Sequence, residues 1–431
     1  MVSVKPFKVT VLNPKAGGNA EFICPVYDTI DASRYEKYSA VQNNIIHITT
    51  RKEGVSVREF VDHAQSCLLR LFNEGVLIEY DKPAYYIYGI RYQLSSEIME
   101  QIPEEDRRET YFIFGLIALV QVEKLNAQNV LGHEKTFESN SHERYELMKE
   151  CGMNFSPIVA EYNMPDHAIN NIFEQYLGFR RPDLKLNANR KPIVDFVLEG
   201  SRHMLWEVSD RQVMAKIEHL MRDKHIMILD GHHRYTASYL LCKDGSTAYT
   251  LMMLVEGGDR ALLLLPWHRC VKECRMTELW AKIESNFAVE RCNRSDVYTK
   301  LNERTSDFDV RLCLYDGTGF YLLRADEQRI RELSNAKGER IGLDVISLHE
   351  WLIAPALIGK PEESIAFTAS PKDAIEKVDT RGYQVAFFMK PLRVADVEYK
   401  ARVEQKGFPQ KSTLFLPKVA EGIVMRRFEH E

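Results

Sequence analysis

The sequence lacks the cysteine and hydrophobic patterns of secreted and membrane proteins. Its eight cysteines are scattered, and none forms a C-x-x-C pair. No secretion signal precedes them, so we expect reduced thiols in a cytoplasmic protein rather than a disulfide framework. Apolar runs such as residues 111–122 and 261–265 stop short of the roughly 18 residues that a transmembrane helix needs. We therefore expect no membrane partner.

A strong charge of one sign is lacking as well. The chain carries 57 basic and 62 acidic residues, a formal net charge of -5, which offers no bulk attraction to nucleic acid. We expect no nucleic-acid partner, and any anion must be bound by a local cluster of residues. A glycine-rich P-loop and a basic helix-turn-helix are also missing from the sequence.

What is present is enough apolar material for a sizeable core, with helical and strand patterns in mixed order. At ~150 residues per domain, 431 residues suggest two or three domains. The periodicities predict an α/β class (α+β, mixed sheet). Predicted helices cover residues 57–73, 211–222 and 235–242, and predicted strands cover residues 84–90, 112–122, 224–230, 249–255 and two stretches within 307–324 separated by Asp316-Gly317.

The segment Asp230-Gly231-His232-His233-Arg234 is the strongest candidate site. An apolar strand ends at a carboxylate, turns on a glycine and enters a helix with two imidazoles and a guanidinium in its first turn. Helix N-termini favour phosphate, and arginine adds a planar fork of donors. Asp230 could instead hold a divalent cation that bridges phosphate oxygens. The alternatives are that Asp230 merely caps the helix, or that the histidines bind zinc.

Two further clusters join cations to groups that can accept or donate protons. In the first, Glu134 lies beside Lys135 and is followed by Arg144, so Glu134 is a candidate general base; a solvated charged loop is the alternative. In the second, Lys411 and the hydroxyls of Ser412 and Thr413 could close over a phosphate, unless the segment is an ordinary edge strand.

Near the N-terminus, Tyr27 and Asp28 follow a Cys-Pro pair, and Arg51 ends a probable strand. These three residues could face a cleft. A structural turn with exposed charges is the alternative.

The segment from Asp230 to Arg234 resembles the phosphate-binding segment of the ParB/sulfiredoxin-like fold, in particular that of free-serine kinases. Five other segments resemble one long-uncharacterised family of about this length. Val26 departs from that family, in which many members carry a second proline. The five segments are CPVYD at 24–28, HEKT at 133–136, NFSP at 154–157, LLLPWHR at 263–269 and KSTLFLPK at 411–418.

The resemblance implies a kinase that transfers a phosphoryl group from pyrophosphate to free L-serine, giving O-phosphoserine and orthophosphate with Mg²⁺. It also implies a ParB/sulfiredoxin-like core at residues 126–270, an N-terminal α/β region at 1–125 and a C-terminal α/β region at 271–431 that contributes the KST segment. L-serine and pyrophosphate would be the partners. The sequence does not predict the oligomeric state.

Residue by residue, the resemblance implies these roles. Glu134, Asp230 and His233 would be catalytic, with Asp230 also holding the metal and Asp28 as the alternative base. The substrate would contact Tyr27, Asp28 and Arg51. The phosphate-binding residues would be Gly231, His232, His233, Arg234, Lys135, Arg144, Lys411, Ser412 and Thr413.

Three other functions remain open at this stage. A nucleotide, ATP or ADP, could replace pyrophosphate as donor. A ParB-like nucleotide-binding regulator is a second alternative, against which the net charge argues. A sulfiredoxin-like oxidoreductase is the third; it would need a reactive cysteine, and Cys242 is the nearest to the segment.

Overall fold

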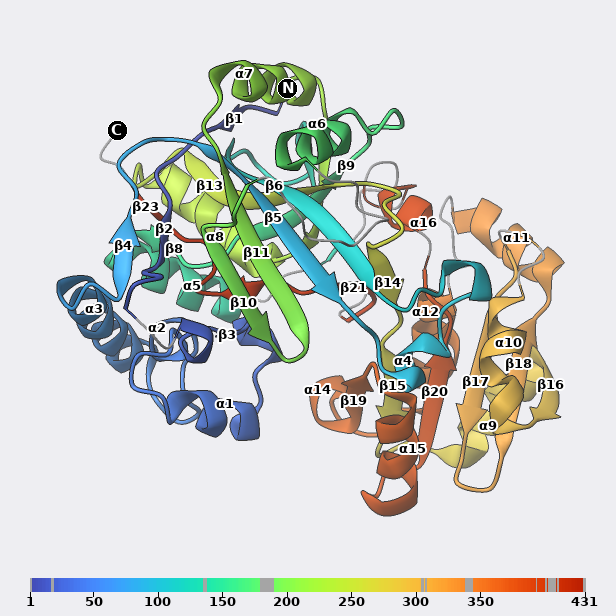
Figure 1. Cartoon of the computed structure of the whole chain (residues 1–431). Coiled ribbons are helices and arrows are strands. Elements are labelled where there is room, and N and C mark those ends of the chain that lie inside the picture. The colour runs from blue at the N-terminus through green and yellow to red at the C-terminus, as the bar shows by residue number, and fades with distance from the viewer. Residues whose placement is uncertain are drawn as a thin grey trace.

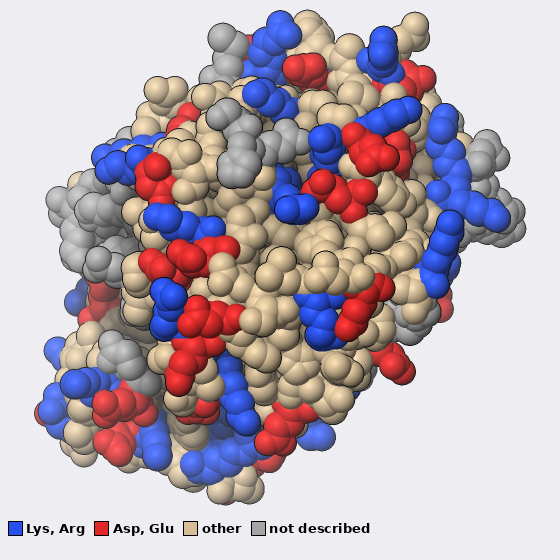
Figure 2. All heavy atoms as spheres, turned by 90° about the vertical axis from the view of Figure 1, so that its left-hand side faces the viewer, with Lys and Arg blue, Asp and Glu red and all other residues tan. Residues whose placement is uncertain are grey.

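The computed structural model describes the chain apart from residues 1, 17–18, 135–137, 179–189, 304–305, 307, 338–343, 393, 400, 402–407, 409–410 and 429–431. It has a mixed α/β architecture with two main sheets, as the sequence predicts (Figure 1). No helix within the described ranges is long and apolar enough to cross a membrane. On the face shown in Figure 2, acidic and basic side chains intermix, so neither sign dominates there.

The larger sheet runs in the order β10-β11-β5-β6-β13-β9-β12-β7, with β1 added beside β6. Neighbours are antiparallel except for the parallel pairs β13–β9 and β12–β7. Strands of the expected regions 1–125 and 126–270 share this sheet, and the domain boundaries stay a prediction. The strands are β1 (Val4–Lys5), β5 (Tyr85–Tyr92), β6 (Tyr111–Gln121), β7 (Val130–Leu131), β9 (Ile158–Tyr162), β10 (Val194–Leu198), β11 (Ser201–Val208), β12 (Ile226–Asp230) and β13 (Tyr249–Glu256).

Helices and loops cover both faces of this sheet. The apolar sides of α6 (Ala168–Leu177) and α7 (Arg211–Met221) pack on one face, where the core contains Trp206. The opposite face is covered by α3 (Val57–Asn73) and by segments from both ends of the chain. Helix α3 begins with a capping box and buries one stripe of apolar side chains, so its bounds are those the sequence predicts.

The smaller sheet lies to the right in Figure 1 and is antiparallel throughout, in the order β16-β18-β17-β20-β15-β19. Its predicted pair of strands, β17 and β18, is joined at the Asp316-Gly317 turn. Its elements are β15 (His268–Val271), α9 (Met276–Asn286), β16 (Phe287–Cys292), α10 (Val297–Asn302), β17 (Arg311–Tyr315), β18 (Phe320–Ala325), β19 (Ile365–Thr368), α15 (Pro371–Thr380) and β20 (Val385–Met389).

The remaining helices and strands lie outside the two main sheets. They include β2 (Thr10–Leu12), β3 (Cys24–Pro25), α1 (Ala32–Ser39), α2 (Ile46–Thr49), β4 (Leu77–Glu79), α4 (Ser96–Met99), α5 (Glu138–Cys151), β8 (Met153–Asn154), α8 (His232–Lys243), β14 (Leu263–Leu265), α11 (Glu327–Lys337), α12 (Asp344–Ser347), α13 (Ala354–Ala356), α14 (Pro361–Ser364), α16 (Val394–Tyr399), β21 (Leu414–Leu416), β22 (Ala420–Glu421) and β23 (Arg426–Arg427).

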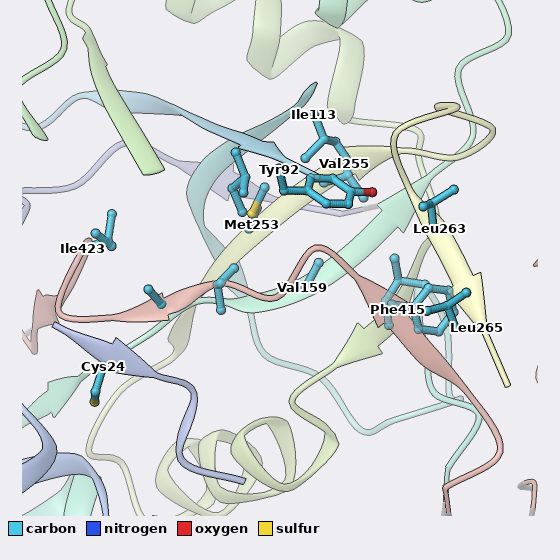
Figure 3. Packing of buried hydrophobic residues seen from close by; sticks show 14 of the residues in the cluster. Cys24, Tyr92, Ile113, Val159, Met253, Val255, Leu263, Leu265, Phe415 and Ile423 are labelled. Atoms are coloured by element: carbon cyan, nitrogen blue, oxygen red, sulfur yellow. The ribbon is translucent and has the colours of Figure 1, made fainter. Parts of the chain in front are cut away.

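The C-terminal segment 411–428 returns from the smaller sheet to the larger one. Along it, β21 pairs with β14, β22 with β3, and β23 with β8. Figure 3 shows Phe415 packed beside Leu263 and Leu265, with Ile423 further along the same segment and Cys24 nearby. This path brings residues from the two ends of the chain to the carboxyl end of β12.

Candidate functional site

The turn between β12 and α8 requires glycine for two reasons. Gly231 has φ of 94°, in the left-handed region that side chains disfavour. A Cβ there would also lie 2.9 Å from Nε and Nη2 of Arg234. The guanidinium therefore folds back over the turn, into space that a side chain at position 231 would occupy.

Asp230 lies at the end of β12, buried between two cations. Its Oδ2 accepts a hydrogen bond from Nη2 of Arg234 at 2.7 Å, and its Oδ1 pairs with Nζ of Lys418. Burial alone would raise the pKa of Asp230, but Lys418 and Arg234 hold it well below the usual range. Asp230 is therefore an ionised carboxylate. The alternative in which Asp230 caps α8 is wrong, because the N-cap residue is Gly231.

Arg234 is buried and anchors the turn. Nη1 donates to the hydroxyl of Ser156 and to the carbonyl of Pro157, both at 2.8 Å, while Nη2 donates to Asp230. The fork of donors that the sequence analysis assigned to phosphate is thus directed at the protein in this structure. A contact from Arg234 to phosphate stays a prediction.

The backbone N–H groups in the first turn of α8 point toward the turn at Gly231. Among the described residues, no side chain caps this helix. Helix N-termini attract anions through these N–H groups and the helix dipole. His233, half-buried, lies 3.2 Å from the hydroxyl of Ser141 through Nδ1. The arrangement suits an anion with Lys418 as its counter-charge.

His232 and His133 form a buried pair of neutral imidazoles, with ring centroids 4.7 Å apart. Burial lowers the pKa of His133 to about 4 and that of His232 well below its ordinary value. The backbone N–H of His133 donates to Nε2 of His232 at 3.4 Å, so we assign the proton of His232 to Nδ1, which faces Glu134 at 3.9 Å.

A hydrogen-bond chain leads from His133 through Thr413 to Glu134. The Thr413 hydroxyl donates to Oε1 of Glu134 at 3.2 Å, and Nε2 of His133 lies 2.9 Å from the same hydroxyl oxygen. Because the single hydroxyl proton points at Glu134, we assign the proton in the second bond to His133. The chain fixes the orientation of the carboxylate.

Glu134 has the pKa expected of a general base. Burial raises its pKa to about 7, against the opposing effects of Lys418 and Lys411 and of the Thr413 hydrogen bond. Its side chain keeps 27% exposure, so a substrate can reach it. A carboxyl group with a pKa near 7 can both accept and return a proton at physiological pH.

The C-terminal segment contributes more to the site than the sequence analysis assigned. Ser412 and Thr413 are buried, whereas Lys411 is exposed, with Nζ 5.0 Å from the centre of the Trp267 ring. Part of this segment is a strand, β21, as the edge-strand alternative required. Lys418 is a candidate site residue that the sequence did not reveal: it ends the KSTLFLPK segment, but only the fold shows that it reaches Asp230.

The N-terminal candidates lie beside Arg144. The Arg144 guanidinium lies 4.3 Å from the centre of the Tyr27 ring, and its Nη2 bonds Glu143, which also accepts from Arg51. Arg51 is therefore connected to Tyr27 through two residues, Glu143 and Arg144. Asp28 is exposed, and its charge helps to raise the pKa of Lys418 against the effect of burial. Lys135 lies outside the described residues.

Within the described part of the chain, no group of three or more His, Cys, Asp or Glu could hold a metal ion. Mg²⁺ needs fewer protein ligands, because it binds through one or two carboxylates and substrate phosphates. Cys242 is half-buried and packs against the apolar cluster beneath α6 and α7.

Comparisons with known proteins identify one family. The model of the family "Protein of unknown function (DUF1015)" matches residues 4–346. No curated protein sequence matches the chain.

Solved structures give only distant likenesses. SbnI with C-terminal truncation from Staphylococcus aureus is 11% identical with a TM-score of 0.37, covering 71% of this chain and 85% of its own. A free serine kinase in complex with AMP is 12% identical with a TM-score of 0.32, covering 67% and 84%. A conserved hypothetical protein from Pyrococcus furiosus is 11% identical with a TM-score of 0.32, covering 67% and 87%. TM-scores of this size carry no inference about chemistry.

Proposed function

Because the chain belongs to the family "Protein of unknown function (DUF1015)", whose description assigns no activity, we propose a function from the site: a kinase that phosphorylates the hydroxyl of free L-serine. The proposed donor is pyrophosphate, and the products are O-phospho-L-serine and orthophosphate. The resemblance of the DGHHR and KSTLFLPK segments to pyrophosphate-dependent serine kinases supports this choice of donor and acceptor.

One observation carries the proposal. Glu134, with its pKa raised to about 7, shares a site with the N-terminus of α8 and with Lys418. A base, an anion site and a buried cation are the groups that phosphoryl transfer to an alcohol requires, because that reaction depends on positioning and charge neutralisation more than on covalent catalysis.

In the proposed mechanism, Glu134 accepts the proton of the serine hydroxyl. The serine oxygen then forms a bond to phosphorus while the bridging P–O bond of pyrophosphate breaks, and the leaving orthophosphate keeps the electron pair of that bond. Lys418 and the N–H groups of α8 stabilise the negative charge on the phosphates. Thr413, held by His133, keeps the carboxylate of Glu134 in place.

In this proposal the protein would supply few of the ligands of Mg²⁺. Asp230 would be its carboxylate ligand, although both of its oxygens also pair with Arg234 and Lys418. When bound, the ion would supply additional charge neutralisation of the donor phosphates. Most of its ligands would then be phosphate oxygens and water.

The test is to incubate the purified protein with L-serine and MgCl₂, with pyrophosphate, ATP and ADP supplied separately, and to measure O-phosphoserine by mass spectrometry. We expect product with pyrophosphate. Product with a nucleotide alone would keep the kinase and make that nucleotide the donor, as the first alternative requires. No product with any of the three would refute a serine kinase.

A further inference from the structure

A fully buried arginine outside the site has no carboxylate partner among the described residues. Arg269 lies in β15 and is 0% exposed. Its Nε donates to Nε2 of His349 at 3.2 Å, its Nη2 donates to the carbonyl of Lys411 at 3.0 Å, and its Nη1 donates to the carbonyl of Trp267. Burial lowers the pKa of Arg269 to about 9, so the guanidinium still carries its charge at neutral pH.

A buried charge of this kind is costly. The three uncharged acceptors around Arg269 offset only part of the cost of taking a guanidinium out of water. By contrast, Arg311, a second arginine buried in the smaller sheet, pairs with Asp309 and Glu303. The difference points to a task for Arg269 in the segment that it holds, which begins at Lys411.

The held segment starts in a strained backbone conformation. Lys411 has φ of 53°, in the left-handed region that side chains disfavour. Its carbonyl accepts a hydrogen bond from Nη2 of Arg269, and its Nζ lies 5.0 Å from the centre of the Trp267 ring. Such a conformation persists only where the surroundings fix it, so Arg269 and Trp267 stabilise the backbone there.

Side chains replace the strand ladder next to this segment. The pairing of β14 with β21 ends at Leu265 opposite Leu414. The next residue, Pro266, has no N–H and cannot continue the pairing. Instead, Nε1 of Trp267 donates to the carbonyl of Thr413 at 3.0 Å. Both carbonyls that flank position 412 are therefore held by side chains of the LLLPWHR segment.

We propose that Arg269 and Trp267 are positioning residues, which hold the KST segment (residues 411–413) so that the hydroxyl of Thr413 stays directed at Glu134. This hydroxyl donates to Oε1 of Glu134 at 3.2 Å. The consequence for catalysis rests on the proposed function, in which Glu134 is the base. The hold on the segment does not depend on that function.

The first experiment needs no substrate. Hydrogen–deuterium exchange followed by mass spectrometry would compare the wild-type protein with Arg269→Met, whose side chain has no donors. A hydrogen bond to a charged group opposes local opening by a factor of about ten or more, so we expect the amides of residues 411–418 to exchange at least about tenfold faster. The matched control is Arg311→Met, which removes a buried arginine from the same sheet and should leave this exchange unchanged. Exchange at the wild-type rate in Arg269→Met, or an equal rise in the control, would overturn the proposal.

A milder variant decides the question if Arg269→Met does not fold. Trp267→Phe keeps a ring beside Lys411 and removes the indole N–H that holds Thr413. Trp267 is half-buried, so we expect this change to leave the fold intact. Exchange of residues 411–418 should rise by about threefold or more, the usual effect of one neutral hydrogen bond. An unchanged exchange rate would overturn the role of Trp267.

The kinetic experiment asks whether Arg269 acts through Thr413. Because a small displacement of a positioned group can cost about 10²-fold, we expect Arg269→Met to lower kcat at least about tenfold. Once Thr413→Val has removed the hydroxyl, adding Arg269→Met should lower kcat by no more than about twofold further. Losses that multiply in the double variant would show independent effects and would overturn the action through Thr413.

The positioning role and the kinase fail separately. If exchange of residues 411–418 rises in Arg269→Met while no donor gives O-phosphoserine, then the kinase is refuted and the hold on the segment stands. If O-phosphoserine forms and Arg269→Met changes neither the exchange nor kcat, the kinase stands and the positioning role is refuted.

Discussion

At the residue scale, the proposed phosphoryl transfer depends most on the side chain of Glu134. Its raised pKa of about 7 means that the carboxylate form, which is the base, predominates only above about pH 7. Activity should therefore rise as the pH increases from about 6 to 8, and it should be lost as the pH falls through about 7.

We expect Glu134→Gln to lower kcat by about 10²- to 10⁴-fold, the usual contribution of a general base, and to remove the rise of activity around pH 7. Thermal unfolding should change little, because the glutamine can still accept the hydrogen bond from Thr413. The check is a pH profile of kcat/KM for both proteins. A glutamine variant with the wild-type profile would show that another group is the base.

Asp230 holds two cations in a buried setting, and its removal should destabilise the fold. In Asp230→Asn, Lys418 and Arg234 lose their counter-charge, and breaking a buried pair by removing one partner costs about 3–5 kcal/mol. Denaturant unfolding measures the change. The control is Asp195→Asn, which breaks an exposed pair with Arg202 and should cost about 1 kcal/mol or less. Equal losses in both variants would contradict the buried-pair account.

At the scale of elements, the turn from β12 into α8 depends on the space over Gly231. Gly231→Ala adds a Cβ at 2.9 Å from the guanidinium of Arg234, which three hydrogen bonds to Ser156, Pro157 and Asp230 keep in place. Displacing this side chain should lower the free energy of unfolding by about 1–3 kcal/mol. This loss adds to the cost of placing alanine at a positive φ.

Gly245→Ala is the matched control for that turn. Gly245 also has a positive φ, of 80°, but a Cβ there would meet no described atom within 4 Å. The control should show only the backbone cost of about 1 kcal/mol, whereas Gly231→Ala should lose more stability and should also lose phosphoryl transfer. Equal unfolding free energies for the two variants would mean that Arg234 moves freely.

The local elements were predictable from the sequence because their signals are local. The helix α3 follows from a repeating apolar stripe, and β5, β6 and β12 follow from dense apolar, β-branched and aromatic runs. For α8, the apolar periodicity covers only residues 235–242, but the predicted first turn with two histidines and Arg234 directly after the glycine is confirmed, because the helix begins at His232. Polar residues in a first turn do not contribute to an apolar stripe.

At the scale of the whole molecule, the site depends on contacts between distant parts of the chain. Thr413 reaches His133 across 280 positions, and Lys418 reaches Asp230 across 188. The sequence showed that these segments carry reactive groups, but no pattern in it shows which segments meet. Lys418 was missed for this reason, because its position depends on how the C-terminal segment pairs with β14 and β3.

The packing of the C-terminal segment should therefore control activity as well as stability. Phe415 is buried against β14. The centre of its ring lies 6.0 Å from the centre of the His133 ring. Phe415→Ala should cost about 3–5 kcal/mol and should also lower kcat of the folded protein, since Thr413 and Lys418 lie on the same segment. Phe388→Ala, in the core of the smaller sheet, should cost a similar amount without lowering kcat. Matching kcat losses would contradict this account.

The measurement that tests the central claim most directly is phosphorus NMR of pyrophosphate, L-serine and MgCl₂ with the wild-type protein, followed over time. The account predicts that one O-phosphoserine appears for each orthophosphate released, and that Glu134→Gln slows both signals together. Orthophosphate appearing without O-phosphoserine would show a hydrolase instead, and unchanged pyrophosphate would contradict the proposed donor.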